Sequence, residues 1–164
     1  WKGFAFEGAE ASFELLIIKT LGQLPDFFEI SGFRVIGDTF LGEKNHNIIT
    51  EASVKVKIDD HNIHTVAEGE GPVNALDTAL RKALVEFYPE VLKYKLCDFK
   101  VRILDSKDGT AATVRVNVET TDGINKWDTV GVSEDIIEAS YMAISDSMMY
   151  GLILHNPDCM DYLD

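Results

Sequence analysis

Apolar residues in the middle of the chain follow the two-residue period of a β-strand. From Thr50 to Asp59 apolar and polar residues alternate, which predicts a strand with one buried face. The apolar positions are Ala52, Val54, Val56 and Ile58. The preceding segment, Phe27 to Phe40, is rich in aromatic and β-branched residues and predicts another strand, with Gly32 as a bend or bulge. A polar loop from Gly42 to Asn47 separates the two.

A turn at residues 59–62 leads into a third predicted strand, Ile63 to Ala67. Three other segments have the three- and four-residue spacing of amphipathic helices. Glu7 to Lys19 places Ala9, Phe13, Leu16 and Ile17 on one stripe. Pro72 suits the first turn of a second helix, which ends before Pro89 and has apolar positions at Val73, Leu76, Leu80, Ala83, Leu84 and Phe87. The third helix, residues 134–149, aligns Ile137, Tyr141, Ile144 and Met148.

The order strand, strand, strand, helix occurs twice after the helical lead-in. The similar segments are Phe33 to Ile36 and Phe99 to Leu104, Val54 to Ile58 and Val114 to Val118, and His64 to Val66 and Trp127 to Val130. A Thr-Val pair precedes a helical alanine by ten residues in both halves, at Thr65 and Thr129. The pattern predicts an α+β fold of two βββα repeats, each with one apolar sheet face. Helices of the same half, of the other half or of a second subunit must cover these faces, and the pseudo-symmetry suits a C2 dimer.

Charge and cysteine content narrow the range of partners. The chain of 164 residues has 15 Lys and Arg against 28 Asp and Glu, a net charge of -13. This charge repels phosphate backbones and anionic lipids, so neither nucleic acid nor membrane is expected as a partner. Two cysteines, Cys97 and Cys159, without metal-ligand spacing predict a cytoplasmic protein without zinc or disulfides. The chain begins with Trp1 rather than Met, and we expect it to be part of a longer protein.

No set of residues forms a catalytic or metal-binding pattern. His61 and His64 lie in a turn and a strand rather than on the helix of a zinc motif, and no serine has a nucleophile-elbow sequence. Cys97 is interpreted as a core thiol. The most suggestive stretch is Gly69 to Pro72, because glycines before a helix allow a carboxylate to approach the helix N–H groups. The alternative is a simple turn.

Four segments together resemble a known family. They are GFAFEGAEASFELL near the start, GEGPVNALDTALRKAL at Gly69 to Leu84, FKVRILDSKDGTAATVRV at Phe99 to Val116, and WDTVGVSEDIIEAS at Trp127 to Ser140. They are similar to the C-terminal part of the citramalate synthase and 2-isopropylmalate synthase family, and the lead-in and the last segment favour the citramalate branch. The resemblance covers nearly the whole chain.

The resemblance implies a regulatory dimerisation domain at residues 27–164, with repeats at about 27–89 and 95–155. Residues 1–26 would be a helical linker from the end of the catalytic part. In this family a TIM barrel condenses acetyl-CoA with a 2-oxo acid and holds a divalent metal with an H-x-H motif. These 164 residues contain no H-x-H, so the chain is expected to be inactive alone and to bind no cofactor. Its expected partners are a second copy, the parent barrel and an amino-acid effector.

The effector implied for the citramalate branch is isoleucine, and for the leucine pathway it is leucine. Transferred by motif, the effector site comprises Gly71, Pro72, Val73, Asn74, Leu96, Phe99, Ile103, Thr113 and Ile136. Phe99 stands where relatives carry Tyr, so that hydrogen bond is lost, and Asn74 stands where an acidic residue can occur. Two alternatives remain at this point: Val73, Leu96 and Phe99 as ordinary core, and a structural dimerisation module without a ligand.

Overall fold

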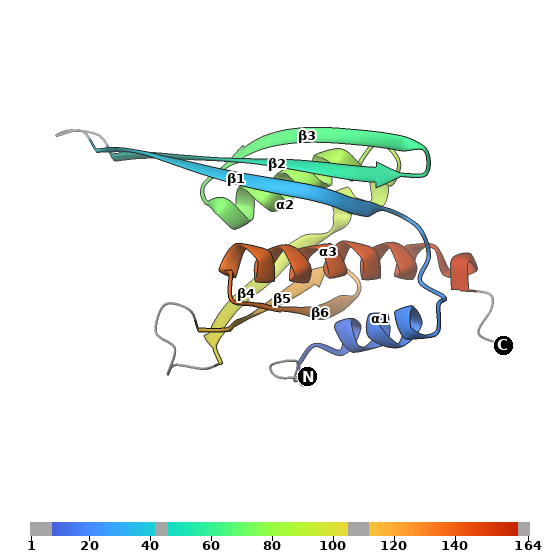
Figure 1. Cartoon of the computed structure of the whole chain (residues 1–164). Helices are drawn as coiled ribbons and strands as arrows, with labels where there is room; N and C mark the ends of the chain where they lie inside the picture. Colours follow the sequence, from blue (N-terminus) through green and yellow to red (C-terminus); the bar gives the residue numbers. More distant parts are fainter. Residues whose placement is uncertain (1–7, 42–45, 105–111, 161–164) are drawn as a thin grey trace. The chain divides into compact units, whose positions relative to one another are not determined.

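A computed structural model describes residues 8–41, 46–104 and 112–160, which form two compact units (Figure 1). The first-repeat unit is Asp26–Pro89. The second-repeat unit consists of the described residues before Asp26 together with those from Glu90 onward. Each unit contains one three-stranded antiparallel sheet and the helix that follows it in the chain. The predicted α+β architecture of two βββα repeats is therefore confirmed.

In the first-repeat unit the strands are β1 (Glu29–Leu41), β2 (His46–Ile58) and β3 (His61–Gly69), in that spatial order. Helix α2 (Pro72–Leu84) packs mainly on β2 and β3. The predicted apolar positions of β2 are at most 1% exposed. Asp59 and Asp60 make the two-residue turn between β2 and β3. Asp59 has a φ of 49°, and a hairpin with so short a turn requires a positive φ of this kind. His46 and Asn47 of the predicted polar loop belong to β2, and the rest of that loop lies outside the described residues.

In the second-repeat unit the sheet order is β4 (Lys95–Ile103), β5 (Val114–Thr121) and β6 (Lys126–Ser133). Helix α3 (Ile136–His155) packs mainly on β5 and β6 and is about one turn longer than the predicted helix. This unit also contains helix α1 (Glu10–Thr20) and two short 3₁₀ segments, η1 (Pro89–Lys93) and η3 (Pro157–Met160). Within the described ranges, no helix has the length and apolar character needed to cross a bilayer.

Strand register shows which residues of the two repeats correspond. Val54 pairs with Phe33 and Thr65, and Val118 pairs with Phe99 and Thr129. The Thr65 hydroxyl donates to the carbonyl of Ala79 at 2.7 Å, and the Thr129 hydroxyl donates to the carbonyl of Ala143 at 2.7 Å. The predicted correspondence of the threonines is confirmed. The predicted alignment of the middle strands is wrong by four residues, because Val118 and not Val114 corresponds to Val54.

Helix α1 packs beside β6 and α3 through a different face from the predicted one. Its buried residues are Ala11, Ser12, Leu15 and Ile18, whereas Phe13 and Ile17 are 47% and 43% exposed. The reason is that β6 is an edge strand whose backbone needs hydrogen-bond partners. The Ser12 hydroxyl accepts from the backbone N–H of Val130 at 2.9 Å and donates to the Asp146 carboxyl at 3.3 Å.

The pKa of the buried Asp146 carboxyl is raised above its usual value. Burial raises its pKa to about 6, although the Ser12 hydroxyl and the Lys19 ammonium oppose the shift. The folded chain therefore binds this proton more tightly than the unfolded chain does. The resulting stabilisation is complete below about pH 4 and is lost as the pH rises through about 6.

We expect Gly131→Ala to destabilise the second-repeat unit by roughly 1–3 kcal/mol, because overpacking strains a close helix–strand contact. A Cβ at Gly131 would lie 1.9 Å from the Ala139 carbonyl oxygen and 2.9 Å from Met142 Cβ. Gly37→Ala is the control, since nothing lies within 4 Å of its Cβ position. Urea denaturation followed by the fluorescence of buried Trp127 measures both variants. Equal stability of the two variants would contradict the close contact.

We expect Asp146→Asn to be more stable than the natural chain by roughly 1–3 kcal/mol at pH 7.5, because the amide carries no charge to desolvate. Ser12 can still donate to the amide oxygen. The difference should shrink towards zero at pH 4.5, where the carboxyl is also neutral. Asp60→Asn, at the exposed hairpin turn, is the control and should show no such pH dependence. Urea denaturation across this pH range provides the test, and a constant difference would refute the assignment to Asp146.

Candidate functional site

The start of α2 presents unpaired backbone donors on a closely packed turn. Gly71 is the N-cap in extended conformation, with φ -168° and ψ 174°, and Pro72 is the first helical residue. Proline has no N–H, so the first-turn donors are the N–H groups of Val73 and Asn74. Neither bonds to another described residue. A free helix N-terminus of this kind favours an anionic group.

Two neighbouring residues fix the shape of this turn. The Glu70 N–H donates to Asn74 Oδ1 at 3.2 Å, so the Asn74 side chain ties the turn to the helix. A Cβ on Gly69 would lie 2.4 Å from the backbone nitrogen of Ala75. Glycine at position 69 is therefore required for β3 to approach α2. Of the sequence-predicted residues, Gly71, Pro72, Val73 and Asn74 are gathered here.

Helix α3 begins at the corresponding place in the other repeat, but its start is capped. Ile136 is its first residue, as Pro72 is in α2. The Asp135 carboxyl accepts from the N–H groups of Ile137 and Glu138 at 2.6 and 3.2 Å. This helix supplies its own anion, whereas Gly71 has no side chain with which to do so. Of the two equivalent helix starts, the one at α2 is open to a ligand.

A bulge in β4 places three sequence-predicted residues on one face of the sheet. The register shifts between Leu96 and Asp98, opposite Thr120 and Glu119. Because of the extra residue, Leu96 shares a face with Phe99 despite their three-residue spacing, and Ile103 lies on the same face by normal alternation. The same shift occurs in β1 between Ile30 and Gly32, as predicted for Gly32. Cys97 lies at the bulge and is exposed, so its interpretation as a core thiol is wrong.

Apolar residues at the open side of β4 are incompletely covered. Ile103 is 64% exposed and Ile136 is 45% exposed. Thr113 precedes β5 and accepts a backbone hydrogen bond from Leu104 at 2.9 Å, so it lies near Ile103. Helix α3 packs mainly on β5 and β6 and leaves this end of β4 open. Such a face can hold an aliphatic side chain or a second protein surface. The predicted residues are thus divided between the two units, and within the second-repeat unit Leu96 and Ile103 lie towards opposite ends of β4.

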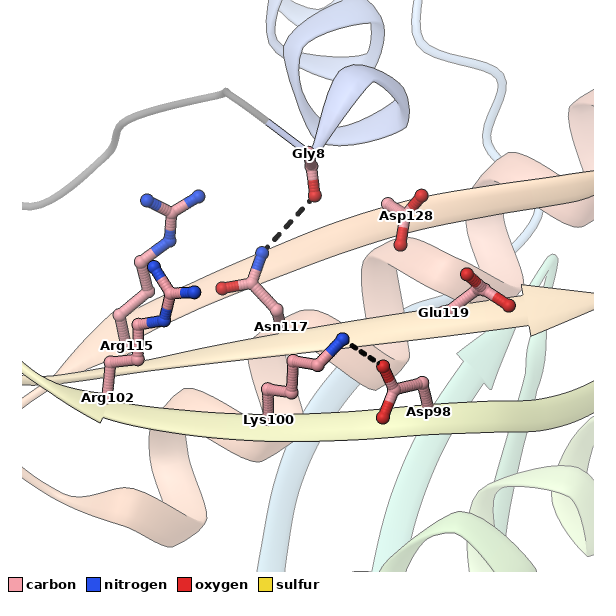
Figure 2. Close-up of a pocket in the computed structure, with 8 residues that line it drawn as sticks. All are labelled: Gly8, Asp98, Lys100, Arg102, Arg115, Asn117, Glu119 and Asp128. Carbon is pink, nitrogen blue, oxygen red and sulfur yellow. Dashed lines mark hydrogen bonds and ion pairs between the residues drawn. The ribbon is translucent and has the colours of Figure 1, made fainter.

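The opposite face of the β4–β6 sheet carries a polar hollow that the sequence analysis did not identify (Figure 2). Its volume is about 430 Å³. The lining residues are Gly8, Asp98, Lys100, Arg102, Arg115, Asn117, Glu119 and Asp128. The signal in the sequence is the set of polar residues at alternate positions of β4 and β5. These polar residues come together only through the register in which β4 pairs with β5.

We call this hollow the polar hollow. Ion pairs and burial shift the pKa values of the carboxyl groups that line it. Lys100 pairs with Asp98, and its ammonium lowers the pKa of that carboxyl. Lys126 pairs with Glu119 at 2.7 Å. Burial raises the pKa of Asp128, and nearby Glu119 adds to the effect. The Asn117 amide donates to the Gly8 carbonyl at 3.3 Å.

A buried chain of polar groups lies at the end of α3. The Tyr94 hydroxyl contacts His155 Nδ1 at 3.2 Å, and His155 Nε2 lies 3.3 Å from Asp122 Oδ2. Hydrogen bonds from the Asn125 and Ile124 backbone N–H groups contribute to lowering the pKa of Asp122 to about 2, whereas burial raises the pKa of Tyr94. A phenol this reluctant to ionise is not an activated nucleophile. We interpret the chain of contacts as an anchor that joins the β5–β6 turn to α3.

Potential metal ligands are spread over the described part of the chain. No three or more His, Cys, Asp or Glu side chains gather there in a group that could hold a metal ion. The ring of His61 packs on Phe87 with centroids 5.4 Å apart, which is a packing role.

Comparison with known proteins connects this geometry to a family. Residues 7–152 match the model of the LeuA allosteric (dimerisation) domain. The chain is 51% identical to (R)-citramalate synthase of Geobacter sulfurreducens over 92% of its length, and 46% identical to that of Aquifex aeolicus over 93%. It spans about 28% of the length of both relatives. A 2-isopropylmalate synthase of Aquifex aeolicus is 31% identical over 70% of the chain.

The match covers both repeats and the lead-in helix α1. The relatives that align over more than nine-tenths of the chain at 46–51% identity are citramalate synthases, and the 2-isopropylmalate synthases align less completely. The paired βββα repeats, together with this alignment, show that the chain belongs to the LeuA allosteric (dimerisation) domain family.

Proposed function

We propose that this chain is the feedback-sensing part of a citramalate synthase and that it binds isoleucine. The observation that carries the proposal is the uncapped start of α2, whereas the equivalent start of α3 in the other repeat is capped by its own Asp135. The N–H groups of Val73 and Asn74 suit the carboxylate of an amino acid. Backbone carbonyls or a nearby acid would accept the ammonium group.

The aliphatic part of the effector requires an apolar surface. The predicted residues Leu96, Phe99, Ile103, Thr113 and Ile136 belong to the second-repeat unit, and we propose them as an apolar contact separate from the α2 start. Discrimination between isoleucine and leucine then depends on shape alone. A displaced methyl group in an apolar pocket changes binding by about 1–3 kcal/mol, so we expect selectivity to be finite.

We propose further that the chain forms a homodimer. Each helix packs mainly on two strands of its sheet, which leaves apolar residues of β4 exposed in the second-repeat unit. The family description as a dimerisation domain supports self-association. The parent protein would carry the acetyl-CoA-dependent barrel and its divalent metal. The two cysteines without metal-ligand spacing favour a cytoplasmic location, and the net charge of -13 disfavours nucleic-acid partners.

We expect isoleucine to raise the melting temperature of the chain, because a ligand at 100 times its Kd stabilises the folded state by about 2.7 kcal/mol. Leucine and valine are compared in the same assay. Gly71→Asp should nearly abolish the isoleucine shift, because its carboxylate would occupy the α2 N–H groups as Asp135 does in α3. Gly71→Ala is the matched control and should retain the shift. An alanine fits at this position, since nothing lies within 4 Å of the Cβ position.

Other outcomes of the melt distinguish the remaining functions. A shift with leucine alone would assign the chain to the leucine-sensing branch. No shift with any of the three amino acids, in a folded dimer, would favour a structural dimerisation module. An isoleucine shift that persists in Gly71→Asp would place the carboxylate elsewhere.

Helix α1 is the proposed link from effector to catalytic barrel. Inhibition requires the effector to prefer one arrangement of the parent protein over another. Deleting α1 would expose the edge of β6, so we choose substitutions on its exposed stripe, Phe13, Ile17 and Leu21.

In the parent enzyme we expect Ile17→Lys to preserve isoleucine binding and to weaken inhibition, since the exposed stripe would meet the catalytic part. Lys19→Ala on the same helix is the control, because Lys19 is exposed but lies off the stripe. Isoleucine binding by calorimetry and inhibition of turnover are measured in parallel. Unchanged inhibition in Ile17→Lys would rule out α1 as the link.

A further inference from the structure

Ser12 joins helix α1 to two other elements of the second-repeat unit. Its hydroxyl accepts from the backbone N–H of Val130 on β6 at 2.9 Å and donates to the Asp146 carboxyl on α3 at 3.3 Å. Ser12 is only 5% exposed, so both bonds lie within the contact between α1 and the rest of the unit. The charge of Asp146 therefore acts directly on the group that attaches α1 to the edge of β6.

The surroundings of Asp146 compensate a negative charge poorly. Burial has the largest effect on its pKa and raises it to about 6, and the described groups that oppose burial are the Ser12 hydroxyl and the Lys19 ammonium, both on α1. Asp128 on β6 is the other acid beside α1. Burial is also the largest cause of its raised pKa, and Glu10 on α1 contributes to the shift. Both carboxyls thus favour their protonated forms while α1 is docked.

Helix α1 has few other contacts that hold it in place. Leu15 and Ile18 are its large buried side chains. A second bond to α3, from the Tyr150 hydroxyl to Glu14 at 2.6 Å, lies at the exposed rim of the contact. A helix of 11 residues is marginally stable in water when it is isolated, so α1 depends on docking for its helical form. The β4–β6 sheet and α3 pack on each other without α1, so α1 can separate while they stay folded.

We propose that the docking of α1 depends on the proton of Asp146: α1 stays on β6 and α3 while this carboxyl is neutral and separates more readily once it is charged. A neutral carboxyl costs little to bury, whereas a carboxylate under α1 loses hydration that one hydroxyl does not replace. Release of α1 returns Asp146 to water, where the pKa of an aspartate is about 4. Release therefore becomes easier as the pH rises from about 4 to about 6, and it changes little above that pH.

The charged form of Asp146 predominates at neutral pH, so α1 is then in its more easily released state. A helix that transmits a signal needs two arrangements of similar free energy, between which a ligand can choose. Ionisation of Asp146 brings the docked and released arrangements of α1 closer together in free energy. This consequence rests on the proposed role of α1 as a link to the catalytic part, whereas the dependence of docking on the proton does not.

The test is amide hydrogen exchange of the chain, followed by two-dimensional NMR without isoleucine. At pH 7.5 we expect the α1 amides of Leu15 and Ile18 to be protected about tenfold more in Asp146→Asn than in the natural chain, because each unit of pKa difference corresponds to a tenfold change. At pH 4.5 the gain should be much smaller. Glu14→Gln is the matched control, since it alters the other bond between α1 and α3 and leaves Asp146 in place. It should show no gain that depends on pH.

A second measurement needs no variant. In the natural chain, the protection of the α1 amides relative to an unfolded chain at the same pH should fall about tenfold between pH 4.5 and pH 7.5. The α1 amides should also exchange faster than the slowest amides of β5, because release of α1 leaves the sheet folded. Equal protection of α1 in Asp146→Asn and the natural chain at pH 7.5 would overturn the proposal. Exchange of α1 as slow as that of β5 would do the same, since α1 would then separate only on global unfolding.

Discussion

In both repeats a threonine hydroxyl fastens the helix to the last strand of its sheet. Thr65 donates to Ala79 and Thr129 donates to Ala143, with the same 2.7 Å distance. This bond fixes the helix over the second and third strands, where small residues such as Gly69 and Gly131 allow close approach. One helix is about 10 Å wide and adjacent strands are about 4.8 Å apart, so it covers about two strands. The first strand of each sheet therefore keeps apolar residues that the helix of its own repeat does not fully cover.

Much of this fold could be predicted from the sequence because local patterns and packing agree. The alternation around Val54, the position of Pro72 and the turn at Asp59 each specify one structure. The middle strands were aligned incorrectly because two alternating segments look alike when shifted by four residues. The interpretation of α1 was wrong because Phe13 and Ile17 outweigh Ser12 in hydrophobicity. The edge of β6 needs a hydrogen-bond partner, and Ser12 provides one for the N–H of Val130.

The sequence predicted more of the candidate site in the first-repeat unit than in the second-repeat unit. The glycine turn before α2 could be recognised because backbone donors at a helix start follow from sequence alone. On β4, the common face of Leu96 and Phe99 depends on a bulge at Cys97, which no local pattern specifies. The polar hollow could not be predicted at all. Arg102 and Arg115 are far apart in the alternating patterns of two strands, and only the register makes them neighbours.

Comparison of the two repeats distinguishes residues that the fold requires from residues that can vary. The core elements are the same in both: the bulge, the central valine and the threonine that holds the helix. Differences fall at positions that the core does not constrain. Gly71 leaves a helix start open where Asp135 closes it, and two arginines stand where the other repeat has Ile36 and Glu51. Since the fold forms with either choice, the core of the repeat does not require a particular residue at these positions, and they can differ between the repeats without loss of the scaffold.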